Sequence, residues 1–377
     1  MNKKIKFLII AGARPNFMKV APIIKQILSY SLDAANHQTQ LEYLLIHTGQ
    51  HYDEKMSDIF FEDLGIPSPD VNLAVGSGSH AVQTANVMIK FEPICEQEKP
   101  DWVVVVGDVN STVACTLVCA KLGIKVAHVE AGLRSFDRGM PEEVNRIVTD
   151  ALADVLLTPS TDANDNLKKE GIPDSKIKLV GNVMIDSLIA NLEKVRASQI
   201  LNQLGLIKKN FVYVTLHRPS NVDNQAGLTR IMSELERIAE DMPVVFSMHP
   251  RTRKMCEQFG ITFDEKKGLT VVDPLGYHDS LCLTEAARFI LTDSGGIQEE
   301  STYFKTPCLT LRPNTERPVT ITMGSNKLTT MDRLSADIDE VLGYSTEIGQ
   351  IPPLWDGLAS ERIINCLIDM TKSGGFG

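Results

Sequence analysis

The sequence lacks an excess of basic residues and any long apolar run. Its formal net charge is −10 over 377 residues, which argues against binding to nucleic acid or to an acidic membrane surface, because both favour a basic face. No apolar stretch is long enough to span a bilayer. The first apolar run, 7–10, is too short for a signal peptide and leads into Arg14-Pro15-Asn16. We therefore expect neither nucleic acid nor membrane as a partner.

Paired cysteine and histidine motifs are also lacking. The seven cysteines are scattered, odd in number and without Cys-x-x-Cys spacing, a pattern that fits free buried thiols in the reducing cytoplasm. His47 and His51 are separated by Thr-Gly-Gln, which breaks a helix, so they do not form a zinc pair on one helical face. The sequence predicts a cytoplasmic protein without an obligatory metal ion.

Two enzyme signatures are missing. The turn after the first apolar run lacks the Gly-x-Gly-x-x-Gly spacing of dinucleotide sites, so we expect no NAD and predict no cofactor. A Gly-x-Ser-x-Gly elbow is absent as well, which argues against hydrolases of that type. What is present is an alternation of short β-rich runs with helical patterns. The expected strands are residues 7–10, 43–46, 102–106, 126–129, 155–157, 211–216, 244–248, 269–272, 289–291 and 308–311.

This alternation predicts an α/β fold with parallel, doubly wound sheets. Because the chain is longer than one ordinary domain and the series of strands starts again in its second half, we expect two similar domains, 1–183 and 184–358. Helical spacing in the last segment, 359–377, predicts a helix that packs back on the first domain or, alternatively, on the second. Ligands of such sheets bind at the carboxyl ends of the strands.

A strand-to-helix turn at residues 293–300 predicts an anion site. Ser294 is available as a helix cap, and Gly295 and Gly296 let a ligand approach the exposed backbone N–H groups of the helix start. A phosphorylated small molecule is the expected ligand. The alternative is an ordinary turn, because short motifs have a real false-positive rate.

Three acidic residues are candidates for proton transfer. Asp108 and Glu130 each end an apolar strand, and Glu142 opens a helix. Carboxylates on opposite faces of a substrate carbon suit proton removal on one face and delivery on the other. Asp108 could instead cap the next helix, and Glu142 or Glu143 could favour a helix start through the dipole. Glu130 is harder to explain structurally, because a carboxylate ending an apolar strand must be solvated, paired or functional.

Basic and histidine side chains also follow expected strands. Arg14 and Lys19 come after the first strand, within reach of a diphosphate. His217 follows 211–216 and can donate to a phosphate or act as an acid. The structural alternatives are solvated surface charges for the two cations and a satisfied structural residue for the histidine.

Seven segments together resemble the non-hydrolysing UDP-N-acetylglucosamine 2-epimerase family. They are Gly-Ala-Arg-Pro-Asn-Phe-Met-Lys at 12–19 and the segments 47–51, 107–108, 128–134, 141–146, 293–300 and 315–318. The resemblance implies two Rossmann-like domains of the glycosyltransferase-B type facing a central cleft, commonly in a homodimer. It also implies an isomerase that reversibly converts UDP-GlcNAc into UDP-ManNAc by inversion at C2.

The resemblance further implies a mechanism and its residues. UDP is lost by anti-elimination, which leaves 2-acetamidoglucal, and is then added back with the proton returned on the opposite face. The residues that handle protons or assist the acid steps would be Asp108, Glu130, Glu142, His217 and Lys19. Those that hold UDP would be Arg14, Ser294, Gly295, Gly296, Glu300, Arg317 and Tyr277, the last near the uracil.

Several alternatives remain open. One is a 2-epimerase of a UDP-2,3-diacetamido-glucuronic acid, and another is a hydrolysing epimerase that releases ManNAc and UDP. A glycosyltransferase would need an acceptor, and a UDP-sugar-binding regulator would gain nothing from nearby carboxylates. Many bacterial members have an acidic residue where this chain has Ser220, which argues against activation by a second UDP-GlcNAc.

Overall fold

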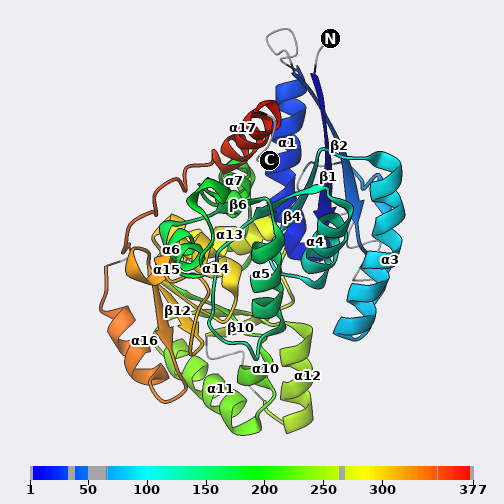
Figure 1. Cartoon of the computed structure of the whole chain (residues 1–377). Coiled ribbons are helices and arrows are strands. Elements are labelled where there is room, and N and C mark those ends of the chain that lie inside the picture. The colour runs from blue at the N-terminus through cyan, green and yellow to red at the C-terminus, as the bar shows by residue number, and fades with distance from the viewer. Residues whose placement is uncertain are drawn as a thin grey trace. The chain divides into compact units, whose positions relative to one another are not determined.

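The structure is a computed structural model that describes residues 3–32, 39–49, 65, 67–262, 268–345 and 347–373. The side chains of Lys3, Arg14 and Pro15 lie outside this described part. Contacts divide the chain into two compact units, Met1–Ser187 with Pro353–Gly377, and Leu188–Pro352. In each unit, helices pack against parallel strands (Figure 1).

The first unit contains, within the described residues, a seven-stranded parallel sheet in the order β3-β2-β1-β4-β5-β6-β7. Its strands are β1 (Lys3–Ala11), β2 (Thr39–His47), β3 (Val71–Asn72), β4 (Trp102–Val106), β5 (Lys125–Val129), β6 (Val155–Thr158) and β7 (Ile177–Leu179). Its helices are α1 (Arg14–Leu32), α3 (His80–Glu98), α4 (Asn110–Leu122), α5 (Pro141–Leu152), α6 (Thr161–Lys169), the 3-10 turn η1 (Asp174–Lys176) and α17 (Ala359–Lys372), while α7 (Val183–Ala190) contains the boundary between the units. Strand β4 is buried along its whole length, as expected for a parallel strand covered on both faces.

The second unit contains, in the part that is described, a six-stranded parallel sheet in the order β10-β9-β8-β11-β12-β13. Its strands are β8 (Val212–Thr215), β9 (Val244–Ser247), β10 (Leu269–Val272), β11 (Phe289–Thr292), β12 (Cys308–Leu311) and β13 (Asn326–Thr329). Its helices are α8 (Leu192–Ala197), α9 (Ile200–Gln203), α10 (Pro219–Val222), α11 (Gln225–Ala239), α12 (Pro250–Phe259), α13 (Tyr277–Ala286), α14 (Gly295–Phe304), α15 (Val319–Thr322) and α16 (Leu334–Leu342). Strand order reverses beside β1 in the first sheet and beside β8 in the second, so both are doubly wound in the Rossmann manner.

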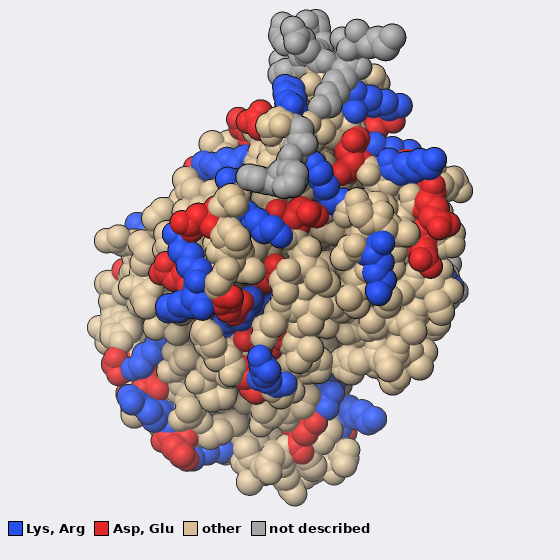
Figure 2. Space-filling view, in the orientation of Figure 1, with Lys and Arg blue, Asp and Glu red and all other residues tan. Residues whose placement is uncertain are grey.

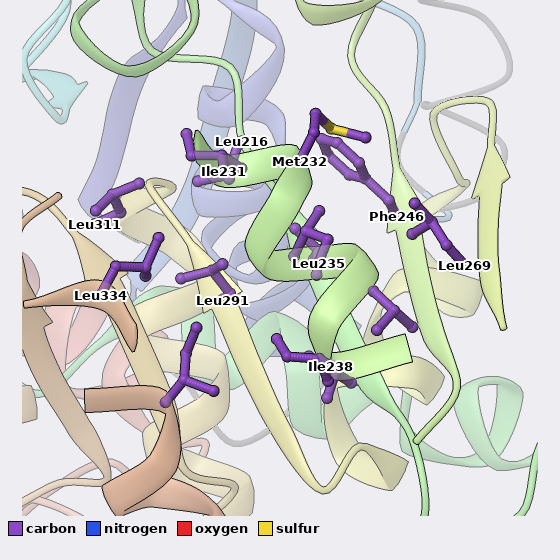
Figure 3. Close-up of a cluster of buried hydrophobic side chains, with 14 of the residues drawn as sticks. Leu216, Ile231, Met232, Leu235, Ile238, Phe246, Leu269, Leu291, Leu311 and Leu334 are labelled. Atoms are coloured by element: carbon purple, nitrogen blue, oxygen red, sulfur yellow. The ribbon is translucent and has the colours of Figure 1, made fainter. Parts of the chain in front are cut away.

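The core of the second unit forms where α11 covers the sheet. Ile231, Leu235 and Ile238 recur at helical spacing and point toward the strands, where Phe246 and Leu291 meet them (Figure 3). The side chain of Asn224 caps this helix by accepting the N–H of Gly227 at 2.9 Å. Each large aliphatic side chain buried in this way contributes about 1.5–3 kcal/mol.

The last helix belongs to the first unit. Helix α17 packs beside α1 (Figure 1). The carboxylate of Asp186, on α7, accepts the backbone N–H groups of Ala359 and Ser360 at the start of α17. Asp186 therefore satisfies two N–H groups that the helix itself leaves free.

The ten strands expected from the sequence are confirmed, each to within a few residues at its ends. The prediction of two Rossmann-like parallel sheets is confirmed as well. Strands β3, β7 and β13 were not predicted, because they are only two to four residues long and each includes at least one polar residue. None of the described helices is long and apolar enough to cross a membrane.

Candidate functional site

Asn16 ties the turn after β1 to the end of β4. Its side-chain oxygen accepts the N–H groups of Gly12 and Ala13 at 3.1 and 2.8 Å, and its amide donates to the carbonyl of Val106 at 3.1 Å. A Cβ on Gly12 would lie 2.7 Å from the hydroxyl of Ser111, so glycine permits this close approach. The strands β1 and β4 are neighbours at the point where the strand order reverses, which is where such folds bind ligands.

Lys19 and Glu130 form a buried ion pair at this edge of the first sheet. Lys19 lies on α1 and Glu130 directly follows β5; they are 8% and 7% exposed. Glu130 has a φ of 71°, a left-handed conformation that is uncommon for a residue other than glycine and often marks a functional turn. A Cβ on Gly107 would lie 2.9 Å from the Lys19 ammonium. The turn that carries Asp108 therefore lies against the ion pair.

Asp108 is held by helix α5. Its carboxylate pairs with Arg146, and its backbone carbonyl accepts the side-chain amide of Asn145 at 2.9 Å. The cap position of α4 is taken by Val109, so the reading of Asp108 as the cap residue of that helix is not supported. The side chain of Asp108 is 26% exposed.

Glu142 and Glu143 differ although both lie in the first turn of α5. Glu143 is buried, accepts the N–H groups of Ser135 and Phe136 at 2.9 and 2.8 Å, and pairs with Arg146. Burial would raise the pKa of Glu143, but these hydrogen bonds and the guanidinium lower it overall. Glu142 is half-buried, and its carboxylate bonds to none of the described residues. Glu143 thus has the structural role, and Glu142 keeps a carboxylate available for chemistry.

Behind these turns runs a chain of ionic contacts that is buried except at its end, Glu170. Asp150, on α5, contacts the ring of His128 at 2.6 Å and the guanidinium of Arg134 at 2.7 Å, and Arg134 also pairs with Glu170. Burial would raise the pKa of Asp150, but the charges of His128 and Arg134 lower it below its ordinary value. Asp150 is therefore ionised at neutral pH.

In the second unit, Asp293 anchors the turn after β8. Its buried carboxylate accepts the backbone N–H groups of His217 and Arg218 and the side-chain amide of Asn221. It also contacts Nδ1 of His217 at 3.0 Å, while the imidazole is 43% exposed. Burial would raise the pKa of Asp293, but His217 and these donors lower it. His217 is oriented through Nδ1, and its partly exposed ring also lies 5.5 Å from the ring of His249, measured between centroids.

The start of α14 lies beside a buried guanidinium. Ser294 occupies the cap position, but its hydroxyl forms no cap hydrogen bond within the described part of the chain. A Cβ on Gly295 would lie 3.0 Å from Arg317, whereas one on Gly296 would meet no atom within 4 Å. Arg317 pairs with Glu316 and, at 2.9 Å, with Glu299. Helix N–H groups and a guanidinium are both suited to a phosphate.

Glu300 and Tyr277 are two buried polar groups of the same unit. Burial, together with the charge of Glu299, raises the pKa of Glu300 to about 8. The hydroxyl of Tyr277 is buried and lacks a hydrogen-bond partner among the described residues. Burial and the charge of Glu300 raise the pKa of Tyr277. Unsatisfied polar groups are rare in protein interiors and call for an explanation such as a ligand.

The predicted residues thus fall into groups within each unit. Lys19, Glu130 and the Asp108 turn meet in the first unit, and Gly295 and Arg317 meet in the second. The side chain of Arg14 lies outside the described residues, as does His51. His47 packs against Phe17 at 5.2 Å between ring centroids. In the described part of the chain, no group of three His, Cys, Asp or Glu side chains could hold a metal ion.

Sequence reasoning missed several residues that organise these groups. Asp293 opens the segment 293–300, but no role was predicted for it, although it follows an apolar strand just as Glu130 does. Asn16 and Arg146 lie within the segments used for the resemblance, but nothing in the spacing indicates their partners. Asp150 carries no local signal, since it lies at an ordinary position of an amphipathic helix.

The family model described as UDP-N-acetylglucosamine 2-epimerase matches residues 33–368. This chain belongs to that family. The UDP-N-acetylglucosamine 2-epimerase of Methanocaldococcus jannaschii is 42% identical over 376 residues, which cover 96% of this chain and 99% of that protein. The UDP-2,3-diacetamido-2,3-dideoxy-D-glucuronate 2-epimerase of Pseudomonas aeruginosa is 41% identical over 328 residues, which cover 86% of this chain and 88% of that protein.

A solved structure of the same family has the same fold. The crystal structure of the M. jannaschii UDP-GlcNAc 2-epimerase, in complex with UDP-GlcNAc and UDP, gives a TM-score of 0.84 at 41% identity and covers 97% of this chain and 100% of that chain. The family recognised from the sequence motifs is confirmed, and so is its fold class.

Proposed function

We propose that this 2-epimerase family member interconverts UDP-GlcNAc and UDP-ManNAc by inversion at C2. The M. jannaschii relative is named UDP-N-acetylglucosamine 2-epimerase, and its crystal structure contains UDP-GlcNAc and UDP. Within this chain, the observation that carries the proposal is the buried pair of Lys19 and Glu130 beside the turn of Asp108. Two carboxylates at one sheet edge, one of them almost fully desolvated, are suited to moving a proton at carbon.

We propose an elimination and re-addition. A carboxylate removes the C2 proton while the C1–O bond to UDP breaks, which gives a C1=C2 double bond in 2-acetamidoglucal and a carboxylic acid on the enzyme. UDP then adds back at C1, and a second acid delivers a proton to the opposite face of C2. Asp108, Glu130 and Glu142 are the proposed proton carriers. Since the C2 proton is not acidic in the intact sugar, its loss must be coupled to departure of the diphosphate.

The proposed UDP contacts come from the remaining residues. We assign the backbone of Ser294, Gly295 and Gly296 to phosphate oxygens, in keeping with a helix start that has free N–H groups. Those expected to support the leaving diphosphate by charge are Arg14, Lys19, His217 and Arg317. Glu300 would accept the ribose hydroxyls, and Tyr277 would lie near the uracil.

The experiment that tests this function is an NMR time course with UDP-GlcNAc in deuterated water, without added metal or nucleotide cofactor. UDP-ManNAc with deuterium at C2 of both sugars is the expected result. Free ManNAc and UDP would place the chain among hydrolysing epimerases instead. No change in UDP-GlcNAc would overturn the proposed substrate.

A second candidate substrate is UDP-2,3-diacetamido-glucuronic acid, because the P. aeruginosa relative named for it is 41% identical to this chain. The two substrates differ by a second acetamido group and a carboxylate on the sugar. Measurement of kcat/KM for both distinguishes them. A higher value for the diacetamido-uronic acid would replace UDP-GlcNAc as the substrate and keep the C2 chemistry.

We further propose a cytoplasmic homodimer. The seven cysteines are all free, which suits a reducing compartment. On the outer side of α3, Val82 and Ile89 are 52% and 67% exposed, and on α5 Val144 is 46% exposed. A second copy of the chain would cover such apolar side chains. Light scattering should give twice the chain mass, and Ile89→Asp should lower it, whereas a monomeric parent protein would contradict the dimer.

The face drawn in Figure 2 gives no support to broad electrostatic binding of a polyanion. On the face drawn in Figure 2, the Lys and Arg side chains of the described residues lie among Asp and Glu side chains and do not gather into one field. With a formal net charge of −10, a UDP-sugar must be bound by local groups such as the start of α14.

A further inference from the structure

His128 is fully buried in β5, two residues before Glu130, and both of its ring nitrogens face acceptors. Nδ1 lies 2.6 Å from the carboxylate of Asp150, and Nε2 lies 2.9 Å from the carbonyl of Gly107. A carbonyl oxygen can only accept, and the carboxylate of Asp150 is also paired with the guanidinium of Arg134 at 2.7 Å, so each ring nitrogen faces an acceptor and carries a hydrogen. The ring is therefore an imidazolium ion that donates in two directions.

Asp150 also contacts the backbone that follows Glu130 in the sequence. Its second oxygen accepts the backbone N–H of Gly132 at 3.1 Å. Gly132 has a φ of 79°, and a Cβ there would lie 2.5 Å from the carbonyl oxygen of Ala163. The backbone turn around Glu130 is thus fixed on both sides, by His128 before it and by Gly132 after it.

We propose that His128 and Asp150 are positioning residues for epimerisation, because their buried ion pair fixes two turns at once. The His128 ring holds the carbonyl that directly precedes Asp108, and Asp150 holds the N–H of Gly132, two residues after Glu130. This inference rests on the proposed function, in which both carboxylates exchange a proton with one carbon atom. Such groups must be held to within about 0.5 Å of their working geometry.

Asp150→Asn tests the role with little change of shape. Its amide oxygen can still accept from Gly132, while its amide nitrogen would donate to Nδ1 of His128 and so leave the ring neutral. We expect kcat to fall about 10- to 100-fold, with KM and UDP affinity changed less than about twofold. The matched control is Asp154→Asn, because Asp154 also accepts a backbone N–H of β5, from Val126 at 2.8 Å, but at the opposite end of the strand.

Three outcomes would overturn the proposal. The first is an Asp150→Asn enzyme with the kcat of the parent. The second is a loss of kcat in step with an equal loss of UDP-binding capacity, since that reports only unfolded protein. The third needs no variant: 15N NMR of the parent at neutral pH should show both nitrogens of His128 protonated, and one unprotonated nitrogen would contradict the imidazolium. A parent that turns over neither UDP-sugar refutes the proposed function, whereas an active parent with an unaffected variant refutes only the positioning role.

Discussion

The carboxylate of Asp293, at the end of β11, accepts the backbone N–H of His217, at the end of β8. These strands are neighbours at the point where strand order reverses. Asn16, in the first turn of the helix α1 that follows β1, makes the corresponding connection in the first unit, where its amide donates to the carbonyl of Val106 on the neighbouring strand β4. Each sheet therefore has a polar side chain spanning the position at which doubly wound folds bind ligands.

Asp293→Asn should separate orientation of His217 from binding of UDP. The amide retains an acceptor for the backbone of the turn but removes the negative charge beside Nδ1, which sets the tautomer and charge of the imidazole. We expect kcat to fall by about 10- to 1000-fold, as for changes to a group that orients a histidine. Steady-state kinetics and UDP calorimetry together provide the measurement. A parent-like kcat would show that the acid or phosphate role of His217 does not depend on this carboxylate.

The same carboxylate should contribute an acid-sensitive part of stability. The pKa of Asp293 is lower in the folded protein than in the unfolded chain. Its contribution to the free energy of unfolding is therefore present above the unfolded-state pKa of about 3.9, and it is lost as the pH falls through the folded-state pKa. Urea unfolding between about pH 6 and pH 3 should therefore show a smaller loss of stability for Asp293→Asn than for the parent.

How far the sequence predicts this molecule can be seen at β4 and β13. The run of four valines in β4 is apolar and β-branched, so its burial in a parallel sheet follows from composition. Asn326–Thr329 has neither property and becomes a strand only because β12 offers it backbone partners. For the site, the sequence places Lys19 and Glu130 at strand ends, but not in contact, because 111 residues separate them. Asp150 was missed for a different reason, because it lies at an ordinary position of an amphipathic helix and carries no local signal.

Glu300→Gln should stabilise the free protein at alkaline pH. The folded-state pKa of Glu300 is raised from 4.5 to about 8, so between these values the folded state holds a proton that the unfolded state has released. Stability from this group is fully present below about pH 4.5 and is lost as pH rises towards 8. Because glutamine does not titrate, the Glu300→Gln variant does not lose stability in this way as the pH rises.

Urea unfolding at about pH 5 and pH 8.5 measures this effect. The variant should gain a few kcal/mol relative to the parent only at the higher pH. Glu257→Gln, an exposed position on α12, serves as the control and should show no such gain. Equal differences at both pH values would mean that the Glu300 carboxylate is not protonated in the folded protein.

Asp108→Asn and Glu142→Gln should each retain UDP binding and lose most epimerisation. A proton carrier contributes about 10²- to 10⁴-fold to a rate, and an amide cannot replace it. The control is Asp101→Asn. Asp101 directly precedes the start of β4, whereas Asp108 follows the end of that strand, and the carboxylate of Asp101 accepts the N–H of Lys6 at 2.8 Å. Near-normal deuterium incorporation at C2 in both variants would contradict the proposed role of these residues in proton transfer.

Arg317→Ala should weaken UDP binding by about 1.5–3 kcal/mol, the usual contribution of a hydrogen bond to a charged group. Because Glu299 and Glu316 would lose a buried partner, the variant should also be less stable. Arg237→Ala is the matched control, since Arg237 also pairs with two carboxylates, Glu234 and Asp339, but is 43% exposed. Unchanged UDP titrations of the Arg317 variant would contradict its assignment to UDP.

Lys19→Met and Glu130→Gln should each destabilise the first unit more than their combination does. Either single change breaks the buried ion pair while one of its charges stays buried, which costs about 3–5 kcal/mol, whereas the double change removes both charges. Urea unfolding of the parent, the two single variants and the double variant completes a double-mutant cycle. We expect a favourable coupling between the two side chains and no epimerisation by the double variant even where it is well folded. Additive losses would mean that the ion pair is not formed in solution, and a folded, active double variant would show that neither charge is needed for the chemistry.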